Sequence, residues 1–144
     1  MYTYAIIDDE PLIRRGTKKK LESLSHLLTC CGEASDGREG LELVRQLKPD
    51  IVILDMQMPV MAGTELLPAL SEEFPSTALI VISGFQNFDY MKQAISSKVI
   101  DYILKPFSKD EIQQTVLKTI DSLKDKEAED HHLTSMVQEK EEAF

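Results

Sequence analysis

The sequence predicts an α/β domain built around a buried parallel sheet. Short continuous apolar runs recur at residues 5–7, 51–54, 79–82 and 102–104. Runs of this length without polar alternation are typical of strands that are buried on both faces, as in a parallel sheet. Segments with the apolar spacing of helices separate the runs, so that a strand–helix unit repeats along the chain. This alternation predicts right-handed crossovers, with helices on both faces of the sheet.

The first half of the chain carries start signals for its helices. Proline is tolerated at the first position of a helix, so Glu10-Pro11 predicts the start of the first one. Residues 27–32 predict a short second strand. Asp36 followed by Glu39 is a variant of the capping box and predicts the start of the second helix. The predicted apolar face of the first helix comprises Leu12, Ile13, Leu21, Leu24 and Leu28.

The second half of the chain predicts three more helices. The third begins at about Thr64, and Pro68 is expected to bend or shorten it, because proline removes a backbone hydrogen bond. The fourth helical pattern spans residues 88–95. Ser108 or Asp110 is expected to cap the last helix. The apolar stripe of that helix comprises Ile112, Val116, Ile120 and Leu123.

Length, composition and charge restrict the class of protein. A chain of 144 residues suffices for one domain, and 42% hydrophobic and 28% charged residues are ordinary for a globular protein. No apolar stretch approaches the roughly 20 residues that span a bilayer, and no secretion signal is recognisable, so we expect a cytoplasmic protein without a membrane partner. The net charge of -9 argues against direct nucleic-acid binding by this chain. The adjacent Cys30 and Cys31 suit neither a disulfide nor a metal site and are expected to be small buried side chains.

Reactive polar side chains follow the ends of four predicted strands. Asp8 and Asp9 follow the first strand, and Asp55, Ser83 and Lys105 each follow one of the later apolar runs. Open parallel sheets place their chemistry just beyond the carboxyl ends of the strands. We therefore expect these side chains, which are far apart in the sequence, to converge on one edge of the sheet.

Three carboxylates at this edge predict a bound cation. Two unit charges about 4 Å apart repel by roughly 4 kcal/mol at an effective dielectric constant near 20. Either a proton or a cation must therefore lie among Asp8, Asp9 and Asp55. Oxygen ligands without sulfur or imidazole favour Mg2+ over Zn2+. The alternative is that Asp8 and Asp9 only cap the helix that begins near Pro11.

Lys105 and Ser83 complete the predicted site. An unpaired ammonium at a buried strand end is costly, so Lys105 is expected to pair with Asp55. Ser83 supplies a hydroxyl for a phosphoryl oxygen, and the Lys105–Pro106 bond is a candidate cis peptide. These groups suit nucleophilic attack by Asp55 on a phosphoryl donor, with Lys105 and a divalent cation stabilising the transferring oxygens.

Four motifs resemble those of the receiver domain of two-component response regulators. They are Asp8-Asp9-Glu10, residues 55–63 (DMQMPVMAG), Ser83-Gly84 and residues 102–107 (YILKPF). They occur in the order of that family, and the resemblance spans about residues 3–123. It implies a flavodoxin-like fold, a three-layer sandwich with a five-stranded parallel sheet of order 2-1-3-4-5 and five helices. We accordingly predict a receiver domain over residues 1–123.

The resemblance also implies a role for each motif residue. Asp55 matches the phosphoacceptor, Lys105 the family's lysine, and Ser83 and Tyr102 the switch hydroxyl and switch aromatic. The residues matched to the Mg2+ site are Asp8, Asp9, Asp55 and, through its backbone carbonyl, Gln57. One departure is Ala62, where the family often has an acid or amide, but this change removes no metal ligand.

Partners and output are also expectations from the resemblance. The chain would take a phosphoryl group from a sensor histidine kinase, and it would act as a signalling receiver rather than as an enzyme. A homodimer through the fourth helix, fifth strand and fifth helix is possible in this family. Residues 83–90 resemble receivers of AraC-type transcriptional regulators. The polar residues 124–144 predict a helical extension or linker to an output domain absent from this chain, through which DNA would be bound.

Two other functions stay open from the sequence. A metal-dependent phosphatase or phosphotransferase with an aspartyl nucleophile usually has a second acid two residues further on. Here Gln57 stands two residues beyond Asp55, and Glu10 stands two residues beyond Asp8. A pure interaction module with an unphosphorylated site would not require the complete set of acids, hydroxyl and lysine.

Overall fold

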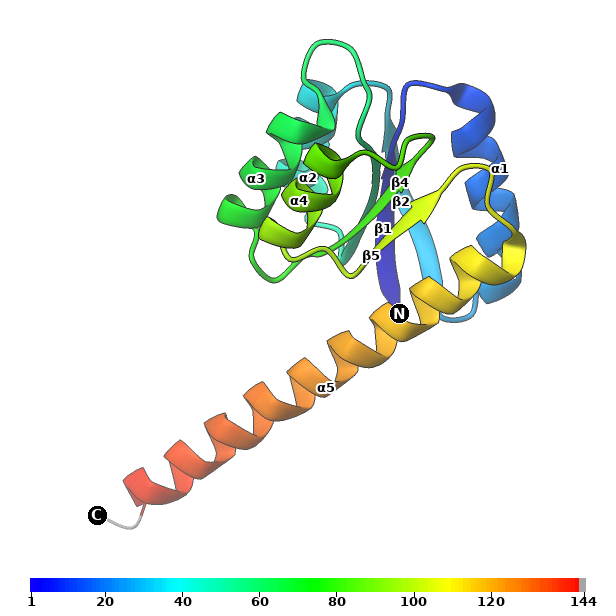
Figure 1. The fold of residues 1–144 in the computed structure, drawn as a ribbon. Coiled ribbons are helices and arrows are strands. Elements are labelled where there is room, and N and C mark those ends of the chain that lie inside the picture. The colour runs from blue at the N-terminus through cyan, green and yellow to red at the C-terminus, as the bar shows by residue number, and fades with distance from the viewer. Residues whose placement is uncertain (143–144) are drawn as a thin grey trace.

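The computed structural model describes the backbone of residues 1–142 and the side chains of residues 1–129. Five parallel strands form one sheet in the order β2-β1-β3-β4-β5 (Figure 1). The strands are β1 (Tyr2–Ile7), β2 (Leu28–Ala34), β3 (Ile51–Asp55), β4 (Ala78–Ser83) and β5 (Asp101–Leu104). The helices are α1 (Pro11–Leu21), the short 3-10 helix η1 (Glu22–Leu24), α2 (Gly37–Leu47), α3 (Gly63–Glu73), α4 (Phe88–Ser96) and α5 (Lys109–Glu142). The flavodoxin-like fold and its strand order are confirmed.

Two hydrophobic cores lie on the two faces of the sheet. Helices α1 and α5 cover one face, and α2, α3 and α4 cover the other (Figure 1). Successive strand residues point to opposite faces. Ile53 therefore belongs to the same core as Ile112 of α5, whereas Leu54 belongs to the core that contains Leu66 of α3. This double burial explains why the strands are continuously apolar.

Several predicted helix starts are confirmed. Pro11 is the first residue of α1. The Asp36 side chain accepts a hydrogen bond of 2.8 Å from the backbone N–H of Glu39, at the start of α2. Ser108 caps α5, because its hydroxyl accepts from the N–H of Glu111 at 3.1 Å. Each cap satisfies an amide that lacks a partner in the first helical turn.

The predicted apolar face of the first helix was partly wrong. Leu12, in the first turn of α1, is 75% exposed and so does not belong to a buried face. Leu24 lies in η1 rather than in the helix, and Leu28 is the first residue of β2. Leu24 and Leu28 match the apolar spacing of a helix only by coincidence, since leucine suits both a buried strand and a buried turn. Pro68 does not shorten α3 either, because it lies exposed inside a helix that runs on to Glu73.

The last helix continues far beyond the sheet (Figure 1). Its first part is buried through Ile112, Val116 and Ile120, whereas residues 124–129 are exposed. The helix has no break at residue 123, the predicted end of the domain, so the boundary stays a prediction. Of the predicted extension 124–144, residues 143–144 lie outside the described part of the chain. None of the described helices combines the length and apolarity that crossing a bilayer requires.

The two cysteines lie side by side on the edge strand β2. Cys30 and Cys31 are both half-buried free thiols. Burial raises the pKa of both thiols above the ordinary value, and high pKa values make thiols poor nucleophiles. The two side chains are therefore less buried than predicted, but their chemistry agrees with a packing role.

Candidate functional site

The strand order brings the predicted site residues to one edge of the sheet. β1 lies beside β3, with Ile7 opposite Leu54, so that Asp8 and Asp55 follow at neighbouring strand ends. β4 lies between β3 and β5, and its last residue, Ser83, pairs with Leu104. Because all the strands are parallel, their carboxyl ends share this edge. The predicted convergence of distant residues is therefore present in the structure.

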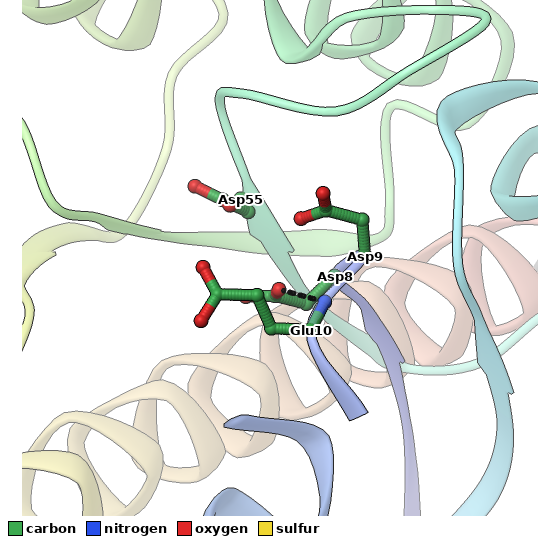
Figure 2. Close-up of side chains that lie close together, drawn as sticks. All are labelled: Asp8, Asp9, Glu10 and Asp55. Carbon is green, nitrogen blue, oxygen red and sulfur yellow. Dashed lines mark hydrogen bonds between the residues drawn. The ribbon is translucent and has the colours of Figure 1, made fainter. Parts of the chain in front are cut away.

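Four acidic side chains gather at the end of β1 and β3 (Figure 2). Asp8, Asp9, Glu10 and Asp55 each present a carboxylate oxygen within 4.8 Å of the others. Asp8 and Asp55 are buried, whereas Asp9 and Glu10 are exposed. Glu10 was not predicted as a site residue, although the run of three acids after the first strand was the available signal. Asp8 does not cap α1, because its Oδ1 accepts from the N–H of Glu10 at 2.9 Å, before the helix begins.

Lys105 extends into this cluster from the end of β5. Its Nζ lies 2.8 Å from Oδ2 of Asp8 and 3.2 Å from Oδ2 of Asp55. A third carboxylate, that of Glu10, lies 3.8 Å away. The lysine follows β5 directly and precedes Pro106, to which it is joined by a cis peptide bond, as the sequence suggested. The predicted pairing of Lys105 with Asp55 is present, and Asp8 is a second partner.

The electrostatics of the pocket follow from burial and from this lysine. Burial raises the pKa of the Asp55 carboxyl, the Lys105 charge opposes that rise, and the Asp8 charge adds to it. Burial lowers the pKa of Lys105, but hydrogen bonds and Coulombic attraction from Asp8 and Asp55 outweigh it and raise that pKa overall. The lysine therefore stays protonated at neutral pH. One ammonium against four carboxyl groups leaves the pocket with excess negative charge.

The donor set fits a hard divalent cation. Every ligand atom in the cluster is a carboxylate oxygen, and the cavity beside it is lined by no cysteine or histidine among the described residues. Above the acids lies a cavity of about 480 Å³, which leaves room for the waters that Mg2+ retains. The residues that line it are Asp9, Glu10, Asp55, Gln57, Met58, Pro59, Gly84, Phe85 and Lys105. Gln57 is among these lining residues, and its role through the backbone carbonyl stays a prediction.

The loop after Asp55 is held close to the acids by a tight turn. The N–H of Met61 donates to the carbonyl of Pro59 at 2.7 Å, which closes a three-residue turn around Val60 with a φ of 69°. A β-branched residue rarely adopts this backbone conformation. Gly63 then packs against the strand end, since a Cβ there would lie 2.5 Å from Cα of Met56. Glycine is therefore required where α3 begins.

No hydrogen bond joins Ser83 or Tyr102 to the four acids among the described side chains. Ser83 is fully buried, and its hydroxyl accepts from the N–H of Phe85 at 3.1 Å. The phenol of Tyr102 donates to the carbonyl of the same Phe85 at 2.7 Å. Burial raises the pKa of Tyr102, so the phenol is neutral and able to donate. Both predicted switch residues thus hold the backbone of the loop between β4 and α4.

A family model identifies the domain. The model of the response regulator receiver domain matches residues 5–117, which include all five strands in part or whole. The chain belongs to the response regulator receiver domain family. The fold is thus that of a receiver, and the resemblance found in the sequence motifs is confirmed at the level of the domain.

Individual relatives agree with the family assignment. The chain is 37% identical over 124 residues to the transcriptional regulatory protein YesN of Bacillus subtilis, covering 86% of this chain and 34% of YesN. It is 36% identical over 110 residues to the nitrate/nitrite response regulator protein NarL of Escherichia coli, covering 76% of this chain and 50% of NarL. The chain therefore spans half or less of the length of these curated relatives. The first relative is named as a transcriptional regulatory protein, and the second as a response regulator protein.

A solved structure matches the fold closely. The REC domain of AraT, a response regulator from Geobacillus stearothermophilus, superimposes with a TM-score of 0.81 at 32% identity. The match covers 88% of this chain and 98% of that domain. A similar likeness links the chain to the signal receiver domain of a NarL from Mycobacterium tuberculosis, with a TM-score of 0.74. The receiver portion is thus matched almost in full.

Proposed function

We propose that this receiver takes a phosphoryl group onto Asp55 from a phosphohistidine of a sensor kinase. The observation that carries the proposal is the placement of the buried Asp55 carboxylate, which lines the cavity and lies 3.2 Å from the Lys105 ammonium. An Asp55 oxygen attacks phosphorus, the P–N bond of the donor breaks, and the histidine leaves with its electron pair. The chain acts as a signalling receiver, not as an enzyme that turns over a separate substrate.

Lys105 and the acid pair serve the transfer in different ways. The Lys105 ammonium stabilises negative charge on the transferring oxygens and remains paired with Asp8. Asp8, Asp9, Asp55 and the backbone carbonyl of Gln57 would hold Mg2+. The bound ion supplies charge neutralisation for the incoming phosphoryl group.

Ser83 and Tyr102 are proposed to couple phosphorylation of Asp55 to a movement of the loop between β4 and α4. A phosphoryl group on Asp55 adds up to two negative charges and strong hydrogen-bond acceptors. Ser83 would then donate to a phosphoryl oxygen, and its present bond to the N–H of Phe85 would be lost. Tyr102 holds the carbonyl of Phe85, so the loop and α4 would shift together with both side chains.

The face formed by α4, β5 and α5 is proposed as a dimer surface for a second copy of the chain. Four of its apolar side chains are exposed. They are Phe88 at 80%, Ile95 at 75%, Leu104 at 40% and Leu117 at 37%. Sedimentation of the Asp55-phosphorylated chain tests this, and a monomer at all concentrations contradicts it.

The output is proposed to be control of transcription through a DNA-binding domain of the AraC type. Residues 83–90 carry the AraC-type resemblance, and relatives such as YesN are named as transcriptional regulators. The polar part of α5 after Leu123 would serve as the linker. Without such a domain, the net charge of -9 disfavours DNA binding.

The central test is the mass of the intact protein after incubation with acetyl phosphate and Mg2+. The parent chain should gain one phosphoryl group, and the Asp55→Asn variant should gain none. Asp9→Asn is expected to reduce the yield without removing the nucleophile. Equal phosphorylation of the parent and Asp55→Asn would disprove the role of Asp55.

A further inference from the structure

Asp8 is held by hydrogen bonds at each of its four polar groups. Its N–H donates to the carbonyl of Ala34 at 3.0 Å, and its own carbonyl accepts from Nη1 of Arg14 at 2.6 Å. Oδ1 accepts from the N–H of Glu10 at 2.9 Å, and Oδ2 accepts from Lys105 at 2.8 Å. Three of these bonds are explained by the fold and the site, but the bond from Arg14 belongs to neither.

Arg14 reaches Asp8 because of its place in α1. Helix side chains lean toward the N-terminus, so an arginine in the first turns can reach back over the strand end. Asp8 lies one residue beyond β1 and is fully buried. A buried carbonyl without a partner is costly. The Arg14 guanidinium satisfies the backbone carbonyl of Asp8, whose side chain belongs to the carboxylate cluster.

A second contact fixes the direction of the guanidinium. Nε of Arg14 lies 3.3 Å from Oε1 of Glu33 on β2, and Nζ of Lys18 lies 2.7 Å from the other oxygen of the same carboxylate. The hydrogen bond from Lys18 is the main cause that lowers the pKa of Glu33, so this carboxylate is ionised at neutral pH. The Arg14 side chain is only 18% exposed. Glu33 therefore orients Arg14, and Arg14 holds Asp8.

We propose that Arg14 is a positioning residue that fixes Asp8 for binding of the divalent cation. The proposal rests on the proposed function, because it assigns Arg14 a role toward the same metal site. Groups that orient metal ligands typically contribute 10- to 100-fold to metal affinity. A planar guanidinium serves two partners in fixed directions, whereas a lysine has a single nitrogen. The bridge between Asp8 and Glu33 therefore requires arginine.

The sign of the effect separates positioning from charge. A cation close to a metal site repels the metal, so loss of its charge alone would tighten metal binding. Loss of positioning would weaken binding instead. Arg15, the next residue, is exposed and has the same charge. It is the matched control, because no hydrogen bond or ion pair joins it to Asp8 or Glu33 among the described residues.

The test is the Mn2+ affinity of the chain, measured from the electron paramagnetic resonance signal of free Mn2+. Arg14→Gln should weaken Mn2+ binding about 10-fold. Arg14→Lys should recover part of that loss, and Arg15→Gln should leave the affinity within about twofold of the parent. Glu33→Ala, which leaves Arg14 in place but removes its orienting partner, should weaken binding less than Arg14→Gln. If Arg14→Gln does not fold, Arg14→Lys and Glu33→Ala decide the question.

A metal-free measurement separates this proposal from the proposed function. Without metal, the N–H of Glu10 should exchange with solvent faster in Arg14→Gln than in Arg15→Gln, because it donates to the Asp8 side chain. A parent chain that binds no Mn2+ would contradict the metal site itself, and the exchange of Glu10 would then decide the role of Arg14. The proposal would be overturned if Arg14→Gln bound Mn2+ as tightly as Arg15→Gln does and if the N–H of Glu10 exchanged at the same rate in both variants.

Discussion

The acidic pocket and the loop that leads to α4 are held very differently, although they adjoin each other. In the pocket, Asp8 has four hydrogen-bond partners, and Lys105 joins it to Asp55. In the loop, the backbone of Phe85 is held by one bond from Tyr102 and one to Ser83. The Phe85 side chain is 50% exposed.

The difference teaches how one domain combines chemistry with a response. Transfer requires charges that are in place before the reaction, since reorganisation during the reaction raises the barrier. A response requires two arrangements that are close in free energy. The many contacts around Asp8 suit the first requirement, and the few contacts around Phe85 suit the second. The predictions that follow test each side of this contrast.

The largest effect is expected from removing the lysine of the pocket. Lys105→Met should slow phosphorylation of Asp55 by about 100-fold, because one preorganised charge at the transferring oxygens is lost. The rate is measured from the mass of the intact protein after timed exposure to acetyl phosphate. Lys109→Met, which removes an exposed lysine four residues away, is the control. Similar rates for the two variants would show that Lys105 has no part in the transfer.

Removing the charge of Asp55 should stabilise the resting protein at neutral pH. The folded-state pKa of Asp55 is raised above its unfolded value, so its protonation contributes stability at low pH. That contribution is lost as the pH rises through the raised pKa. Asp55→Asn should therefore be more stable than the parent at pH 7, and the stabilities of the two proteins should converge in acid.

Urea unfolding between pH 3 and pH 7 measures this difference. Glu73→Gln, at an exposed carboxylate whose pKa is lowered by its hydrogen bond with Arg45, is the control with the opposite sign. A parent whose stability relative to Asp55→Asn does not change over that range would contradict the raised pKa.

A smaller effect is expected at the loop. Tyr102→Phe removes the phenol hydroxyl that donates to the carbonyl of Phe85. The loss should speed amide exchange in residues 85–96 several-fold, since one such bond contributes about 0.5–1.5 kcal/mol.

In the parent protein, binding of beryllofluoride with Mg2+ should change the amide exchange of residues 91–105. No difference there would argue against coupling of the pocket to α4.

The smallest effect is expected at the exposed side chains of α4. Phe88→Ser should change the free energy of unfolding by no more than about 0.5 kcal/mol, because Phe88 is 80% exposed. Leu66→Ala, in the core, should cost roughly 2–5 kcal/mol by comparison. Thermal or urea unfolding distinguishes the two, and a large loss in Phe88→Ser would mean that the ring is packed in solution.

The sheet and its strand-end site could be predicted because few local patterns determine them. A continuous apolar run that ends on Asp55 or Lys105 is visible in the sequence, and parallel strands bring such ends together. Exposure was harder to predict. Phe88 suits either a core or a surface, and only the packing of α4 against the sheet shows that it faces outward.

Contacts that depend on the whole fold lay beyond sequence analysis. Lys105 pairs with Asp8 as well as Asp55 because β1 and β3 are adjacent, and the order of strands came from the family resemblance rather than from periodicity. The contact of Arg14 with Asp8 depends on the position of α1 relative to the end of β1. No residue pattern within the first turn indicates that this arginine reaches backwards.

The unbroken α5 helix has a mechanical consequence. At a rise of about 1.5 Å per residue, the 22 steps along the helix from Ile120 to Glu142 form a rod of about 33 Å. A tilt of about 5° where the rod is seated against the sheet would move its far end by roughly 3 Å, by simple leverage on the same dimensions. A movement too small to disturb the packing at Ile112 would thus be magnified for any structure attached beyond the rod.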